Sequence, residues 1–225
     1  MGKADLHIHT TWGDGTATVR QILDRVAEIG LDVIAITDHD DLRAAWEARD
    51  LAGEYAFEVI PGEEITTLQG HLLALFLERP VKMLRPLQWT IEAVHEQGGL
   101  CIAPHPLSWL TRSLGERAVR RACMDLDGIE VINPSLAGRV TAAKVATLND
   151  RVLHLPETGS SDAHHLLGVG AAFTTFEGRT AEEFRGSLKA GTTSAGGNFV
   201  WHREMTGVMK ARTAYRWRKY VLRAS

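Results

Sequence analysis

The stretch DLHIHTTWGDGT, residues 5–16, holds three side chains of the kinds that bind metal ions. His7 and His9 lie two residues apart, and Asp14 follows beside glycines. In an extended segment, residues two apart point to the same face, so both imidazoles can reach one ion. Because a solvated histidine pair is more common than a metal-binding pair, this segment alone leaves both interpretations open.

More histidines and carboxylates lie where apolar runs end. The run DVIAIT leads to His39 and the run GLCIAP leads to His105. In a parallel barrel the carboxyl ends of the strands meet at one mouth, so we expect such residues to form one cluster. The candidates are His7, His9, Asp14, His39, Glu64, His71, His105, Asp162 and His164.

Imidazoles and carboxylates without thiolates are typical ligands of zinc, manganese or iron. They argue against a cysteine-rich structural zinc site and against an all-oxygen calcium site. Nine candidates exceed the needs of one ion, so two or three ions with a shared carboxylate are expected. A water that bridges such ions is acidic enough to be hydroxide near neutral pH, which indicates a catalytic centre.

The elements that must position these residues alternate between strand and helix patterns. Helices are predicted over residues 18–30, 90–99 and 180–191. The first stops at Gly30, which suits a left-handed cap, and the last begins with Thr180 and Glu183 in the spacing of a capping box. The predicted strands are residues 32–40, 57–65, 71–77, 99–106, 128–134 and 155–164.

Composition indicates one globular domain, with 225 residues, 44% hydrophobic and 24% charged. No apolar run approaches the roughly 18 residues that span a bilayer, and the first residues lack the apolar core of a signal peptide. We therefore expect a cytoplasmic protein without a transmembrane segment. Cys101 and Cys123 form no recognisable pair, so reduced cysteines are expected.

The sequence changes in character near residue 200, which predicts a domain over 1–200 and a separate tail over 201–225. The tail carries seven cationic residues and one anionic residue in a chain whose net charge is −3, with tryptophans and tyrosines between the cations. Such a segment could bind short single-stranded nucleic acid, an anionic membrane surface or a protein partner. The plainer alternative is a solvated helix whose aromatic residues pack on the domain.

The motifs DLHIHT, DGT, ITDHD, PGEEIT, GH, APHP and GSSDAH occur in this order over residues 5–164. Together they resemble the polymerase and histidinol phosphatase (PHP) superfamily. The resemblance implies a distorted (β/α)7 TIM-like barrel with a metal cluster at its C-terminal mouth. It also implies a metal-dependent phosphoric ester hydrolase.

The resemblance further implies three metal sites, of which Glu64 bridges the first two, and catalytic roles for Glu64, His105, Asp162 and His164. His71 begins a strand and could instead form a local hydrogen bond. Asp14 stands where many relatives have a histidine. The first site would use His7, His9, Glu64 and Asp162, the second Glu64, His71 and His105, and the third Asp14, His39 and His164.

Three arginines follow predicted strand ends and are candidates to bind the substrate phosphate: Arg43, Arg112 and Arg139. The planar guanidinium group can pair with two phosphate oxygens, although most arginines simply lie at the surface.

Neighbouring polar residues have open roles. Asp38 or Asp40 could orient a metal-bound imidazole. Asn133 could position water or substrate, or stabilise the turn before Pro134. Glu63 should point away from the face that carries Glu64.

The leading hypothesis is a phosphoesterase that hydrolyses a phosphomonoester, a nucleotide or another small phosphate, through a metal-bridging hydroxide. The first alternative is a nuclease or phosphodiesterase that acts at the 5′ end of oligonucleotides. A regulatory module that binds metal without catalysis is the second, but every assignable ligand position keeps a competent residue. Amide or C–C bond hydrolysis is the third, and no lysine stands at a strand end to support it.

Overall fold

The structure is a computed structural model that describes residues 1–197; the predicted tail, residues 201–225, lies outside the described residues. The strands are β1 (Gly2–Asp5), β2 (Val33–Ile36), β3 (Glu58–Thr66), β4 (His71–Leu75), β5 (Leu100–Ala103), β6 (Gly128–Ile132), β7 (Glu157–Gly159), β8 (Ala172–Phe176) and β9 (Ser194–Gly197). The helices are α1 (Val19–Ile29), α2 (Arg43–Leu51), α3 (Leu87–His95), α4 (Gly115–Ala122), α5 (Leu136–Arg139), α6 (Ala142–Leu148) and α7 (Ala181–Lys189).

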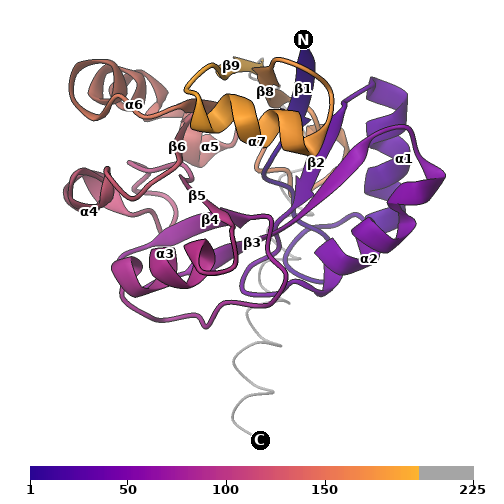
Figure 1. The fold of residues 1–225 in the computed structure, drawn as a ribbon, viewed down its shortest axis with the longest axis horizontal. Helices are drawn as coiled ribbons and strands as arrows, with labels where there is room; N and C mark the ends of the chain where they lie inside the picture. Colours follow the sequence, from indigo (N-terminus) through magenta and orange to yellow (C-terminus); the bar gives the residue numbers. More distant parts are fainter. Residues whose placement is uncertain (198–225) are drawn as a thin grey trace, which may run out of the picture.

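All nine described strands belong to one sheet, in the order β7-β6-β5-β4-β3-β2-β1-β8-β9 (Figure 1). The two end regions of this sheet approach each other. The Thr174 hydroxyl of β8 donates to the Gly159 carbonyl of β7 at 3.0 Å, and the Gly159 N–H donates back to that hydroxyl at 3.1 Å. The sheet therefore curls into a nearly closed barrel, which confirms the predicted fold class.

One departure from regular strand–helix alternation lies between β3 and β4. These strands form an antiparallel hairpin without an intervening helix, and β4 is also antiparallel to β5. The register pairs His71, the first residue of β4, with Thr66, the last residue of β3. The start of β4 therefore lies at the same end of the barrel as the carboxyl ends of its parallel neighbours.

The ends of α1 and α7 agree with the predictions, whereas α3 spans Leu87–His95 and not the predicted residues 90–99. α1 begins after Thr18, which makes a capping box with Gln21, and it ends at Gly30 with φ of 69°. α7 begins with the predicted capping box between Thr180 and Glu183. Because these signals satisfy the free backbone groups at a helix end, they fix where each helix starts and stops.

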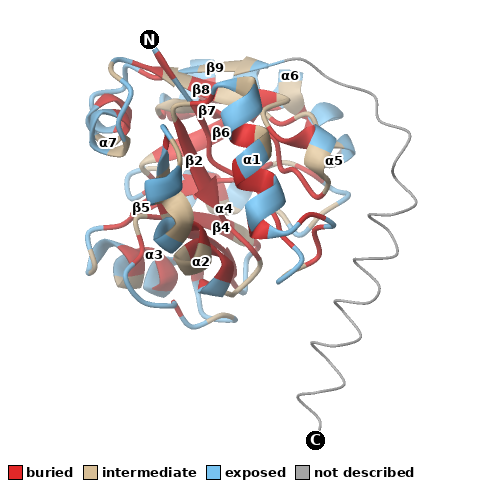
Figure 2. Cartoon of the chain, turned by 90° about the vertical axis from the view of Figure 1, so that its right-hand side faces the viewer, coloured by how far each residue is buried: buried red, intermediate tan, exposed pale blue. Residues whose placement is uncertain are grey.

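The apolar core has two parts on opposite sides of the sheet. One part packs between the strands and the surrounding helices, and buried residues line the inward faces of α1 and α2 (Figure 2). The other fills the barrel and includes Ile60, Ile102 and Phe176 together with Phe184 and Leu188 of α7. Figure 1 shows α7 lying across the end of the barrel at which β1 begins. Apolar side chains thus close that end, which leaves the opposite mouth for polar groups.

Two further observations concern residues 1–197. Cys101 and Cys123 are both free. None of the helices in this part of the chain is both long and apolar enough to cross a bilayer.

Candidate metal centre

The two histidine-containing segments from opposite ends of the domain lie side by side. The His9 N–H donates to the Ala163 carbonyl at 2.9 Å, and the Ala163 N–H donates to the His7 carbonyl at 3.3 Å. This short parallel bridge sets His7 and His9 beside Asp162 and His164. The Nε2 atoms of His7 and His9 lie 3.6 and 3.4 Å from Asp162 Oδ1.

Glu64 occupies the centre of the cluster, and its two carboxylate oxygens face different histidines. Oε2 lies 3.4 Å from Nε2 of both His7 and His9. Oε1 lies 2.8 Å from Nδ1 of His71 and 3.0 Å from Nε2 of His105. Ligand atoms about 2.1 Å from one tetrahedral ion lie about 3.4 Å from each other, so the first spacing suits a shared cation.

A third group of side chains surrounds Asp14. Its carboxylate oxygens lie 3.3 Å from His164 Nε2 and 3.7 Å from His39 Nε2. His9 also approaches Asp14, with Nδ1 at 3.6 Å, and the second nitrogen of His39 lies 3.0 Å from Glu64 Oε2. The structure thus gathers the three residues that were predicted to form a third site. His9 and His39 join this group to the rest of the cluster.

All nine predicted side chains therefore lie together, and their burial shows where the cluster opens. His7, His9 and Glu64 are completely or almost completely buried. The side chains of His39 and His71 are each 13% exposed, so solvent reaches the cluster from their side. The position of His71 next to Glu64 favours a role in the cluster over the local hydrogen bond considered from the sequence.

Some buried imidazole nitrogens of the cluster are not satisfied by hydrogen bonds. Within the described part of the chain, Nε2 of His7 and both ring nitrogens of His9 have no hydrogen-bond partner. Buried polar atoms of this kind cost free energy unless a partner is present. Divalent cations would satisfy them, because lone pairs of neutral imidazoles and carboxylate oxygens converge on the same points. The donor set therefore fits a polynuclear metal centre.

The charges of these groups are strongly coupled. Burial by itself raises the pKa of Glu64 and Asp162, but the surrounding imidazoles bring the pKa of both carboxyl groups well below its usual value. Burial and then the neighbouring His164 lower the pKa of His9 to about 3, which keeps this imidazole neutral. Burial also lowers the pKa of His39, but the Glu64 carboxylate outweighs it and raises the pKa to about 9. Metal binding at His39 would therefore release a proton.

Glu130, in the middle of β6, is a functional candidate that was missed from the sequence. Its carboxylate lies 3.3 Å from His7 Nδ1 and accepts hydrogen bonds of 2.7 Å from the His105 N–H and from Asn133 Nδ2. Asn133 Nδ2 is also 3.4 Å from Asp162 Oδ2. A carboxylate on Nδ1 fixes an imidazole with its Nε2 lone pair free for a metal. The sequence signal that could have identified Glu130 is a charged residue inside the apolar run GIEVI.

Other polar neighbours have structural partners. Asp38 accepts from the N–H and hydroxyl of Thr10, and Asp40 accepts from those of Thr66. These bonds fix the loops that carry the cluster, and a role of Asp38 or Asp40 in orienting an imidazole stays a prediction. Glu63 accepts from the Val81 N–H at 3.3 Å, on the side away from Glu64, as predicted.

The three arginines considered for phosphate binding lie on loops or helix ends. Arg43 forms an ion pair with Asp41 and lies 4.6 Å from the ring centre of Trp12. Arg112 donates to the Thr67 carbonyl at 3.3 Å, and Arg139 is exposed at the end of α5. Their role as a phosphate clamp stays a prediction.

Comparison with known proteins places this cluster in a family. Residues 5–152 match the PHP domain family, and residues 146–193 match a PHP-associated region. An uncharacterised protein of Methanocaldococcus jannaschii is 42% identical over 143 residues, which cover 58% of this chain and 81% of that protein. A 5′-3′ exoribonuclease of Haemophilus influenzae is 38% identical over 99 residues, which cover 42% of this chain and 36% of the enzyme.

Structural similarity extends over nearly the whole chain. A two-domain protein of Bacteroides vulgatus that contains a predicted PHP-like metal-dependent phosphoesterase superposes with a TM-score of 0.71 at 21% identity, covering 93% of this chain and 69% of that one. The fold agrees with the family match, which covers most of the chain and all but two of the clustered residues. The chain belongs to the PHP domain family and is a metal-dependent phosphoesterase.

Proposed function

We propose that this phosphoesterase hydrolyses a phosphomonoester, of a nucleotide or another small phosphorylated compound, at a centre of two to three manganese, zinc or iron ions. The observation that carries the proposal is the placement of Glu64, whose two carboxylate oxygens face separate sets of histidines. A carboxylate so placed suits two adjacent ions. A phosphomonoester dianion carries more charge than a diester, and several cations are suited to neutralise it.

The residues of the cluster would have different roles, according to their positions. Glu64 and Asp162 hold the negative charge that retains the ions, while His105 and His164 complete the second and third groups. When bound, the ions supply charge neutralisation of the phosphoryl oxygens and acidify a water. The Thr111 hydroxyl, 3.3 Å from His105 Nδ1, helps to fix that ring. The phosphate would enter beside His39 and His71, the most exposed histidines of the cluster.

A second candidate is hydrolysis at the 5′ end of oligonucleotides. It is favoured by the similarity to the exoribonuclease, although that match covers about a third of the enzyme. A nuclease of this kind would release mononucleotides, whereas a phosphomonoesterase releases inorganic phosphate. The two activities are therefore separated by their products.

The test begins with protein purified without added metal, in which we expect about two to three equivalents of transition metal per chain. The same sample is assayed for phosphate release from nucleoside monophosphates, sugar phosphates and 5′-phosphorylated oligonucleotides. Phosphate release that stops with a chelator and returns with manganese or zinc supports the proposal. Shortened oligonucleotides without phosphate release would support the nuclease instead. Absence of turnover, even after metal is restored, would support the regulatory module.

A separate prediction concerns the third group. Replacing Asp14 by asparagine removes the charge that faces His39 and His164, so we expect the protein to lose about one metal equivalent and keep the others. Elemental analysis of the purified variant measures this directly. Asp50→Asn, a change on the exposed surface of α2, is the matched control and should keep the full metal content. Loss of all metal in Asp14→Asn would contradict an independent third site.

A further inference from the structure

A groove of about 640 Å³ opens between the loop that follows His9 and the helix α2. Its lining includes two indoles and two guanidinium groups, from Trp12, Trp46, Arg20 and Arg43. We propose that this groove binds the base of a nucleotide whose phosphate lies at the metal centre, with Trp12 as the stacking residue. The inference rests on the proposed phosphomonoesterase function and names the substrate class as nucleotides.

The groove is tied closely to the metal cluster. Trp12 lies between His9 and Asp14, and two consecutive residues span at most about 7 Å of chain. The loop is held in place, since the Trp12 N–H donates to the Thr10 hydroxyl at 3.0 Å and Thr10 in turn bonds to Asp38. The loop that carries the indole is therefore fixed, and predicted ligands stand on both sides of Trp12 in the chain, His9 before it and Asp14 after it.

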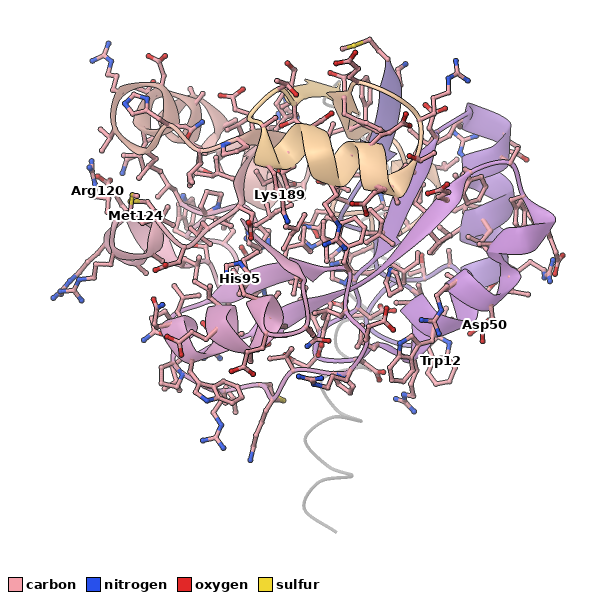
Figure 3. The ribbon with its side chains drawn as sticks, viewed as in Figure 1. Trp12, Asp50, His95, Arg120, Met124 and Lys189 are labelled. Atoms are coloured by element: carbon pink, nitrogen blue, oxygen red, sulfur yellow. The ribbon has the colours of Figure 1, made fainter. Side chains whose placement is uncertain are left out.

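The indole itself is both held and accessible. Its Nε1–H donates to Glu47 at 2.7 Å, and the Arg43 guanidinium lies 4.6 Å from its ring centre. Trp12 nevertheless remains 42% exposed. Figure 3 shows Trp12 and Asp50 on the same edge of the molecule, where both line the groove. A fixed aromatic ring beside arginines and carboxylates suits a base, which stacks on the ring and donates from its amino edge.

The test compares two phosphomonoesters that differ only in the base. For Trp12→Ala we expect kcat/KM for adenosine 5′-monophosphate to fall about five- to tenfold, the lower part of the range for base–aromatic stacking. For ribose 5-phosphate the value should stay within about twofold, because no base is present to stack. Trp12→Phe, which keeps an aromatic face, should recover part of the loss.

Trp89→Ala is the matched control. Trp89 is 43% exposed and has the Arg85 guanidinium 5.6 Å from its ring centre, but it lies on α3 outside the groove. This variant should retain the nucleotide preference of the wild type. Equal losses on both substrates in Trp12→Ala would show a structural role and overturn the proposal. A wild-type enzyme that does not prefer adenosine 5′-monophosphate over ribose 5-phosphate would also overturn the proposal.

A binding titration separates this inference from the proposed function. If no monoester is hydrolysed, the proposed function fails, yet wild-type protein should still bind adenosine 5′-monophosphate about five- to tenfold more tightly than Trp12→Ala does. Equal affinity of the two proteins would overturn the groove assignment independently of turnover.

Discussion

Glu64→Ala is expected to lower kcat/KM for phosphate release about a thousandfold, which corresponds to the several kcal/mol that metal ions contribute to transition-state charge stabilisation. The reason is its central position, because Oε2 faces His7, His9 and His39 while Oε1 faces His71 and His105. Removing the side chain weakens both ion positions together. Steady-state kinetics and elemental analysis should show loss of activity and loss of metal in the same sample.

Glu63→Gln provides the control for this prediction. Glu63 is the adjacent residue of β3 and is equally buried, but its carboxylate accepts from the Val81 N–H on the other side of the strand. The amide keeps an acceptor there, so activity and metal content should remain near those of the wild type. Circular dichroism should show the same secondary structure in both variants. A Glu64→Ala protein that keeps its activity would disprove the bridging role.

Glu130→Gln should weaken metal binding about 10- to 100-fold, as is usual when the partner of a metal-bound histidine is changed. Glu130 touches no predicted substrate position, yet it contacts the His7 ring, the His105 backbone and Asn133. The oxygen of the glutamine amide can replace only some of these contacts. Its NH₂ group can only donate a hydrogen bond, and it would face His7 Nδ1–H, which is also a donor. Competition with a chelating dye measures the change in affinity.

A matched control for Glu130 is Glu157→Gln on the neighbouring strand β7. Glu157 also accepts from an asparagine amide, at 3.3 Å from Asn149 Nδ2, but it has no contact with the cluster among those described. The metal affinity of the Glu157→Gln protein should equal that of the wild type. Unchanged affinity in Glu130→Gln would show that His7 needs no carboxylate to be oriented.

The candidate ligands could be predicted from the sequence because they lie in short motifs at strand ends or, for Asp14, in the loop between β1 and α1. The direction of β4 could not, because an apolar run such as HLLALFL reads the same in a parallel and an antiparallel strand. The direction of β4 determines whether His71 can join the cluster. His71 reaches the mouth of the barrel only because β4 runs opposite to β3. Glu130 was missed for a related reason: its partners are set by side-chain contacts across strands, not by spacing.

Other limits on prediction came from sequence signals that are weak or non-local. β9, with the sequence SAGG, lacks the β-branched residues of a typical strand, and it is formed by pairing with β8. Arg112 lies on a loop as predicted, whereas Arg43 begins α2 and Arg139 ends α5. Ion pairs such as that of Arg43 with Asp41 depend on local conformation that the sequence pattern does not give. Local signals such as the cap of α1 were read correctly because they depend on neighbouring residues alone.

The bridge between Ile8 and Ala163 has a consequence for how the protein matures. A chain that is still being synthesised has only the first half of this bridge until residues 162–164 emerge, so Asp162 and His164 join His7 and His9 late. Contacts between residues so distant in sequence form slowly, because a long loop must close first. Ions captured earlier would meet incomplete ligand sets. Stable metal loading therefore follows completion of the barrel, and nascent chains that stop before residue 162 should bind metal weakly.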